Sequence, residues 1–134
     1  MNNGRYLTIL DLARYDLMAR SGILAKLFKM GWFPILTAET ILFKKPLKCF
    51  DRFTVETKVL GWGEKEFLVQ QEFFCKQQLT ATAIIQVRFL KKSGGSVLPE
   101  EIMALVDYKD PSPILPDWVA RWHDDQTALR NAGQ

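Results

Sequence analysis

Residues 79–90 read LTATAIIQVRFL, and this stretch decides the fold more firmly than any other. Apolar side chains recur at every second position from Ala81 to Phe89, and polar side chains occupy most positions between them. Successive side chains of a strand point to opposite faces, so this alternation predicts a strand with one buried face. Such strands are typical of antiparallel sheets that pack one face on a core.

Three further strands are expected upstream of this segment. The second and third alternate in the same way, and a glycine-bearing turn near residues 61–64 joins them into a hairpin. The first is expected to carry one shared face made of Ile35, Thr37, Glu39, Ile41 and Phe43. The four expected strands span residues 34–46, 53–60, 66–75 and 79–90.

A helix is expected over residues 5–20, with apolar side chains on nearly all of its sides. A helix of this kind is buried, so the meander of strands has to wrap around it. The predicted fold class is therefore α+β, an antiparallel sheet wrapped around one long central helix. A single sheet leaves a face or an edge exposed, which favours pairing with a second copy of the chain.

The C-terminal third is predicted to extend this core. A basic, glycine-containing loop at residues 91–96 leads to a short helix at 99–106, and a proline-rich connector follows at 110–116. Asp117 is expected to cap a final helix that ends near Arg130. We expect one domain over residues 1–134, with its core at about 1–92 and the extension at about 97–130.

The composition excludes several classes of protein. A net charge of +3 and a charged fraction of 25% give no argument for nucleic-acid binding, and no zinc-site spacing appears. Cys49 and Cys75 are expected to be reduced, with a disulfide as the alternative. No apolar run has membrane-spanning length and no signal peptide is apparent, so a cytoplasmic location is expected.

The first residues, Met1 to Tyr6, lead directly into the expected helix. The first backbone N–H groups of a helix have no partner within it and form a site for negative charge. Asn2 or Asn3 can cap this helix, and Gly4 permits close approach of a ligand to the backbone. The alternative is an ordinary N-terminus with an asparagine cap.

The chain resembles the hotdog-fold thioesterases of the 4-hydroxybenzoyl-CoA and acyl-ACP kind. Met1–Tyr6 matches the second half of that family's pattern Asp-x-Asp-x-x-x-His-Met-Asn-Asn-x-x-Tyr, which precedes the central helix. Residues 43–47 resemble its aromatic-x-x-Pro-Leu segment. The segments 50–53, 60–62 and 83–89 then follow in the expected order, so the resemblance covers residues 1–92.

One part of the family's pattern has no counterpart in this sequence. The family's first strand, its catalytic aspartate and its histidine all precede the matched methionine. Either the true start lies further upstream and supplies the aspartate, or the protein is naturally short, and both alternatives stay open.

The resemblance implies that the start of the central helix polarises the thioester carbonyl. Backbone N–H groups near Asn3 and Gly4 would stabilise the developing oxyanion. Asp11 is the candidate carboxylate, because some hotdog thioesterases use one from this helix as nucleophile or base. The alternative for Asp11 is a structural pairing with Arg14 or Tyr15.

The resemblance also implies a coenzyme A thioester or an acyl-carrier-protein thioester as substrate. Lysine and arginine side chains suit the phosphates, and the alternative is that they only solvate strand ends. The acyl tail would lie near Tyr6, Leu10 and the apolar face of 35–43. Glu39 faces either a partner subunit's pocket or solvent, and the single histidine, His123, is expected to pack in the last helix. The candidate substrate-binding residues are Asn2, Tyr6, Glu39, Lys44, Lys45, Arg88, Lys91 and Lys92.

The expected function is acyl-CoA thioester hydrolysis by a homodimer or tetramer, with no metal or redox cofactor. One alternative is a hotdog domain that only binds acyl thioesters or a protein partner. A hydratase is a weaker alternative, because that family pairs aspartate with histidine in the helix region and Asp11 has no histidine nearby.

Overall fold

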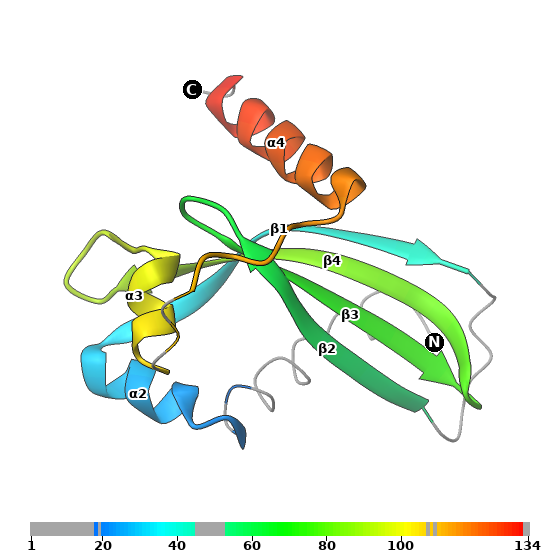
Figure 1. Cartoon of the computed structure of the whole chain (residues 1–134), viewed down its shortest axis with the longest axis horizontal. Coiled ribbons are helices and arrows are strands. Elements are labelled where there is room, and N and C mark those ends of the chain that lie inside the picture. Colours follow the sequence, from blue (N-terminus) through cyan, green and yellow to red (C-terminus); the bar gives the residue numbers. More distant parts are fainter. Residues whose placement is uncertain (1–17, 19, 45–52, 107, 109, 133–134) are drawn as a thin grey trace.

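The computed structural model describes residues 18, 20–44, 53–106, 108 and 110–132 (Figure 1). Most of the helix predicted at 5–20 lies outside the described residues, although Met18 and Arg20 are helical. The helices are α2 (Ile23–Met30), α3 (Pro99–Ala104) and α4 (Asp117–Ala132), and the strands are β1 (Trp32–Phe43), β2 (Phe53–Trp62), β3 (Phe67–Cys75), β4 (Gln78–Lys91) and β5 (Ser96–Val97).

The strands form an antiparallel sheet in the order β1-β4-β3-β2, and the short β5 pairs with the end of β4. β2, β3 and β4 are the predicted meander, and β1 lies beside β4. Figure 1 shows α2 and α3 together at one end of the sheet, and α4 apart from them. The sheet and its helices confirm the α+β class.

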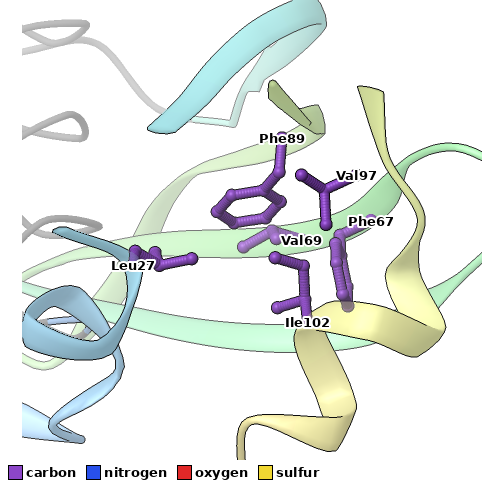
Figure 2. Close-up of a cluster of buried hydrophobic side chains, with 6 residues drawn as sticks. All are labelled: Leu27, Phe67, Val69, Phe89, Val97 and Ile102. Carbon is purple, nitrogen blue, oxygen red and sulfur yellow. The ribbon is translucent and has the colours of Figure 1, made fainter. Parts of the chain in front are cut away.

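The two faces of the sheet pack against different helices. One face, here called the α3 face, carries Phe67, Val69 and Phe89, which pack with Leu27 of α2 and Ile102 of α3 (Figure 2). The opposite face, here called the α4 face, carries buried residues that pack against the C-terminal helix: Leu68, Ile84 and Val119, with Leu60, Leu115 and Trp122 around them. The predicted inward faces of β3 and β4 are both confirmed, because directly paired residues of an antiparallel sheet share a face.

The predicted face of β1 is wrong in its first half. The pairing with β4 shifts between Leu36 and Ala38, so Thr37 is an extra residue in a bulge. A bulge reverses the phase of the alternation, because the side-chain period of a strand is two. Glu39 therefore lies opposite Ile85 as expected, whereas Thr37 contacts Gln86 on the α4 face.

The expectation of reduced cysteines is also wrong, since Cys75 is disulfide-bonded. The only other cysteine of the sequence, Cys49, lies outside the described residues. The spacing of two cysteines in a sequence does not show whether the fold brings them together, which is why the expectation failed. Cys75 ends β3, where it pairs with Phe53, the first residue of β2.

The glycine-bearing turn between β2 and β3 is confirmed, but its glycines serve a different purpose from the expected one. A Cβ atom at Gly61 would lie 2.6 Å from Ser112 Oγ, and one at Gly63 would lie 2.7 Å from His123 Nε2. Both distances are shorter than a carbon side chain tolerates. Glycine is required here because the C-terminal extension packs directly on the backbone of the hairpin.

Candidate functional site

A cavity of about 760 Å³ lies on the α3 face at one end of the sheet. The sheet forms one wall of the cavity, through the start of β1, the second half of β2 and the adjoining parts of β3 and β4. Side chains of α3 and of the segment that follows it close the other side. Representative lining residues are Leu36, Val59, Trp62, Val87, Met103 and Tyr108.

The wall formed by α3 is held in place by contacts at both ends of that short helix. At its start the Leu98 backbone N–H donates to Glu101 Oε2 at 2.8 Å. At its end the Lys26 ammonium of α2 donates to the Leu105 carbonyl at 2.8 Å, where a cation suits the helix dipole. Ile102 anchors the middle of the helix in the core. α2, α3 and the sheet therefore form one packed unit around the cavity.

The described lining of the cavity is almost entirely apolar. The polar side-chain groups among the described lining residues are the hydroxyl groups of Ser21, Thr57 and Tyr108 and the indole N–H of Trp62, and none of those residues is a carboxylate or a histidine. A pocket with many apolar walls and a few polar groups is typical of ligand sites. The cavity suits an apolar group and leaves acid–base chemistry to residues elsewhere.

One polar pair on the α3 face was not anticipated from the sequence. The Gln71 amide donates to Thr57 Oγ1 at 3.2 Å. Gln71 is polar, yet it occupies an inward strand position and is fully buried. A buried amide of this kind has to be hydrogen-bonded. The signal was present in β3, because Gln71 interrupts the apolar series of Phe67, Val69 and Phe73.

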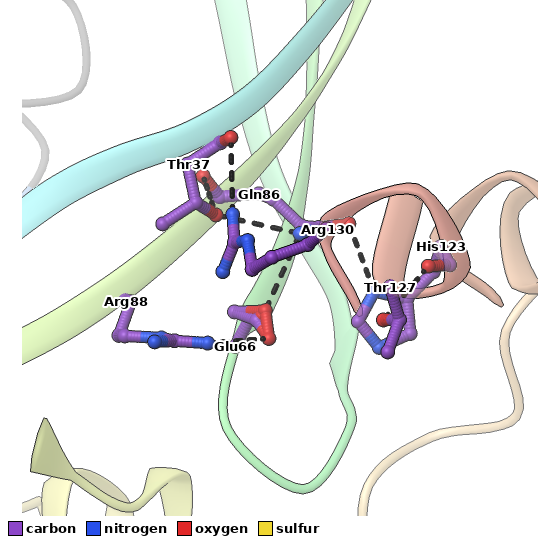
Figure 3. Close-up of polar contacts among 7 residues, drawn as sticks. All are labelled: Thr37, Glu66, Gln86, Arg88, His123, Thr127 and Arg130. Atoms are coloured by element: carbon purple, nitrogen blue, oxygen red, sulfur yellow. Dashed lines mark hydrogen bonds and ion pairs between the residues drawn. The ribbon is translucent and has the colours of Figure 1, made fainter. Parts of the chain in front are cut away.

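A second cluster of polar side chains lies on the α4 face, away from the cavity (Figure 3). Glu66 is 5% exposed; its carboxylate accepts from Arg88 and Gln86, both at 3.3 Å. The Gln86 amide also donates to Thr37, and His123 Nδ1 lies 2.9 Å from Gln86 Oε1. Since the oxygen of an amide only accepts, His123 donates through Nδ1. This network ties α4 to the sheet.

Arg88 therefore lies in a setting that differs from the one expected of a phosphate ligand. Its guanidinium is bound to Glu66, and its side chain is 21% exposed. Gln86 and Arg88 are two positions apart on β4, so they share the α4 face and not the cavity face. The proposed role of Arg88 in substrate binding stays a prediction that this geometry does not favour.

The predicted lysines lie at opposite ends of the sheet. Lys44 follows β1, and its backbone N–H donates to the Thr80 carbonyl at the end remote from the cavity. Lys91 and Lys92 lie at the cavity end, where β4 turns toward β5. Lys91 follows Phe89 by two positions and continues the α3 face beyond the cavity. Of the described lysines that were predicted to bind substrate, Lys91 is the one that lies on the face of the sheet that borders the cavity.

All three predicted catalytic residues lie outside the described part of the chain, whereas one predicted binding residue of β1 can be located. Glu39 is half-buried opposite Ile85 and does not line the cavity. The cavity also borders β1 only at residues 34–36, not along the expected stretch to 43. The predicted site residues outside the described residues are Asn2, Asn3, Gly4, Tyr6, Asp11 and Lys45.

The described part of the chain contains neither a cluster of metal-ligand side chains nor a membrane-spanning helix. There, no three His, Cys, Asp or Glu side chains are grouped in the way that metal ligands are. No helix within the same residues is both long enough and apolar enough to span a bilayer.

Comparison with known proteins gives a consistent result. A family model described as the thioesterase-like superfamily matches residues 1–123. Protein THEM6 of Xenopus laevis is 28% identical over 122 residues, which are 91% of this chain and 58% of that protein. The chain thus spans less than two thirds of the length of this curated relative.

Solved structures share the fold. The probable thioesterase YbaW of Escherichia coli has a TM-score of 0.71 at 21% identity, over 78% of this chain and 83% of that one. A Staphylococcus aureus protein solved in complex with CoA has a TM-score of 0.66 at 15% identity, over 87% of this chain and 78% of its own. The antiparallel sheet with its helices is the hotdog fold that the sequence resemblance implied.

Proposed function

The chain belongs to the thioesterase-like superfamily, and from this premise we propose that it hydrolyses acyl thioesters of coenzyme A or of an acyl carrier protein. The observation that carries the proposal is the apolar cavity of about 760 Å³ on the α3 face. An acyl chain is the part of such a substrate that gains most from leaving water. Each buried methylene contributes about 0.8 kcal/mol.

The charged part of the substrate would remain outside the cavity. Coenzyme A carries phosphates at the end remote from the thioester, and lysine binds phosphate without a fixed geometry. Lys91 continues the face of the sheet that forms the cavity, and Lys92 is exposed beside it. We assign both to this outer part of the site. The S. aureus structural neighbour was solved with CoA, which supports this class of ligand.

The proposed reaction is the attack of water on the thioester carbonyl carbon. The C–S bond breaks, the thiolate takes up a proton, and a carboxylate and a free thiol are the products. Backbone N–H groups at Asn3 and Gly4 are proposed to stabilise the oxyanion, and Asp11 to act as the base that takes a proton from this water. In the alternative, the Asp11 carboxylate is the nucleophile: it displaces the thiolate to form an anhydride, which water then hydrolyses. These roles rest on the family resemblance, since the three residues lie outside the described part of the chain.

The proposal is tested by filling the cavity. Val59 lines it and is 44% exposed, so a larger side chain is accommodated without disrupting the core. We expect Val59→Trp to lower kcat/KM for a long-chain acyl-CoA by about tenfold or more, because several methylenes lose their buried position. The released thiol is measured as a function of substrate concentration.

Lys58→Trp is the matched control. Lys58 is exposed on the same strand, and its side chain points to the other face. Its kcat/KM is expected to equal that of the unmodified chain. Equal loss in both variants, or no loss in Val59→Trp, would contradict an acyl site in the cavity.

A second candidate function is the binding of acyl thioesters without hydrolysis. The observation that favours it is the absence of a carboxylate or histidine among the described residues that line the cavity. Calorimetric binding of an acyl-CoA without any release of thiol would support this second function over the first.

We also propose that the protein is a homo-oligomer. Within the described sheet β1 and β2 are the edge strands, and an unpaired edge favours association with another strand. Light scattering at micromolar concentration is expected to give a dimer or a tetramer, and a monomer would contradict this.

The cytoplasmic location stays a prediction from the sequence. The disulfide at Cys75 weighs against it, because disulfides persist mainly in oxidising compartments. Alkylation of unreduced protein taken directly from cells distinguishes a reducing location from an oxidising one. Labelled cysteines would be free thiols and would favour the cytoplasm.

A further inference from the structure

We propose that Tyr108 and the connector, defined as residues 110–116, form the end wall of the cavity and limit the length of the acyl chain that it accepts. This inference rests on the proposed function, because it takes an acyl chain as the occupant. It assigns a specificity role to one segment of the C-terminal extension.

The connector is fastened to the end of β2 by a specific hydrogen bond. The Trp62 backbone N–H donates to Ser112 Oγ at 2.8 Å, and the Ser112 hydroxyl donates to the Pro113 carbonyl at 2.9 Å. A register shift between Val59 and Gly61 occurs just before this point. The edge strand therefore bonds to the connector where a further strand would otherwise pair.

Gly61 allows the connector to lie directly on the strand. A Cβ atom there would meet Ser112 Oγ at 2.6 Å, a Leu115 methyl carbon at 2.9 Å and the Pro113 carbonyl oxygen at 3.0 Å. Two of these contacts are too short for any real Cβ atom. The connector is thus seated against backbone, and its position is determined by β2.

Tyr108 joins this wall to α3. Its ring meets Trp62 edge-on, with the ring centres 5.6 Å apart and an angle of 80° between their planes. Its backbone N–H donates to the Met103 carbonyl at 3.0 Å, and its hydroxyl lies 3.5 Å from the Pro111 carbonyl. Trp62 in turn contacts Phe67 with ring centres 5.7 Å apart. The aromatic ring at the end of the cavity is therefore held from three sides.

The position of this wall relative to the cavity gives it a limiting role. Thr57, Val59 and Trp62 of β2 line the cavity, as do Tyr108 and Pro113. Tyr108 packs on the Trp62 ring, and Pro113 follows Ser112, which is bonded to the Trp62 backbone, so both lie at the Trp62 end of this row. The strands cannot move apart without breaking the sheet. A chain that extends along β2 therefore stops at Tyr108, and further methylenes remain in water.

Binding measurements on a series of saturated acyl-CoAs, from butyryl to stearoyl, test the inference without requiring hydrolysis. In the unmodified chain the affinity is expected to rise by about fourfold per methylene up to a limiting length and then to level off. In Tyr108→Ala the rise is expected to continue to longer chains. Tyr108→Phe keeps the ring and is expected to retain the original limit.

Val106→Trp provides an independent variant in the opposite direction. Val106 lines the cavity beside this wall and is 38% exposed, so the larger ring is accommodated without loss of the fold. Its limiting length is expected to be shorter than that of the unmodified chain. This outcome is measurable even if Tyr108→Ala does not fold.

The outcomes separate the inference from the proposed function on which it rests. Chain-length limits that are the same in folded Tyr108→Ala, in Val106→Trp and in the unmodified chain would overturn the end wall while leaving the acyl site intact. No acyl-CoA binding at any length, in any variant, would overturn the proposed function and this inference together.

Discussion

The two faces of the sheet are packed to different degrees. On the α4 face Leu68 and Val119 are 0% exposed, and a hydrogen-bonded network seals the junction between helix and strand. On the α3 face the same strands border a cavity of about 760 Å³, and Leu36 and Val59 remain 46% and 44% exposed. A protein interior is normally close-packed, so a persistent apolar hollow indicates a place for a ligand. The comparison predicts that the α4 face contributes more to stability, and it supports the proposal that the α3 face binds the ligand.

The largest expected effect is a difference between two identical substitutions, one on each face. Leu68→Ala removes a side chain from a filled core and is expected to lower the free energy of unfolding by about 3 kcal/mol. Leu36→Ala removes the same atoms beside an existing cavity and is expected to cost under about 1 kcal/mol, since it creates no new void. Urea unfolding measures both.

If the two faces differ in function, only one variant of this pair is expected to affect binding. Acyl-CoA affinity is expected to change in Leu36→Ala and to be unchanged in folded Leu68→Ala. Equal losses of stability in the two variants would mean that the α3 face is as well packed as the α4 face, and the comparison would fail.

The next effect concerns the ion pair on the α4 face. Glu66→Gln leaves the Arg88 guanidinium without its anion, and Arg88 Nε is already buried without a hydrogen-bond partner. We expect the free energy of unfolding to fall by roughly 2 kcal/mol. This is less than for a fully buried ion pair, because Arg88 is 21% exposed. Glu64→Gln, at an exposed position in the same turn, is the control. A loss below about 0.5 kcal/mol would show that water already satisfies Arg88.

Much of the sheet could be predicted because burial of one face of an antiparallel strand appears in the sequence as alternating apolar and polar residues. The inward residues of β3 and β4 follow from alternation alone, and the register confirms them. Which residues of β1 face inward before the bulge could not be predicted, because the bulge depends on the pairing of β1 with β4. Nothing in the identity of Thr37 marks it as the extra residue.

The candidate site was harder to predict because it depends on contacts between distant segments. Tyr108 reaches the cavity through its packing on Trp62, and the disulfide of Cys75 depends on the register of a hairpin. The glycines at 61 and 63 did carry a signal. The sequence predicts turn residues at both positions, whereas in the structure these glycines make room for Ser112 and His123.

Gly63 offers a test of how tightly α4 is seated. A Cβ atom in Gly63→Ala would lie 2.7 Å from His123 Nε2, and the imidazole is held by Gln86 and cannot easily move away. We expect Gly63→Ala to lower the free energy of unfolding by roughly 1 kcal/mol. The clash of the added methyl group in the folded state outweighs the stabilisation that alanine gives by restricting the unfolded chain. Adding His123→Ala removes the clash, so the double variant should lose less than the sum of the single variants. Strict additivity would mean that α4 is not seated on this turn.

The smallest effect is a gain of stability at a site that belongs to neither face. The two residues that join β3 to β4, Lys76 and Gln77, have φ angles of 52° and 66°, and neither is glycine. A side chain in the left-handed region is strained by roughly 1 kcal/mol, and Asn-Gly is the preferred pair for this type of hairpin turn. Lys76→Asn combined with Gln77→Gly is therefore expected to raise the free energy of unfolding by about 1 kcal/mol.

Because the turn is remote from the cavity and from α4, the difference in stability between Leu68→Ala and Leu36→Ala should be the same in this background to within about 0.5 kcal/mol. A changed difference would show that the hairpin couples the two faces, and the division between a stable face and a binding face would no longer hold.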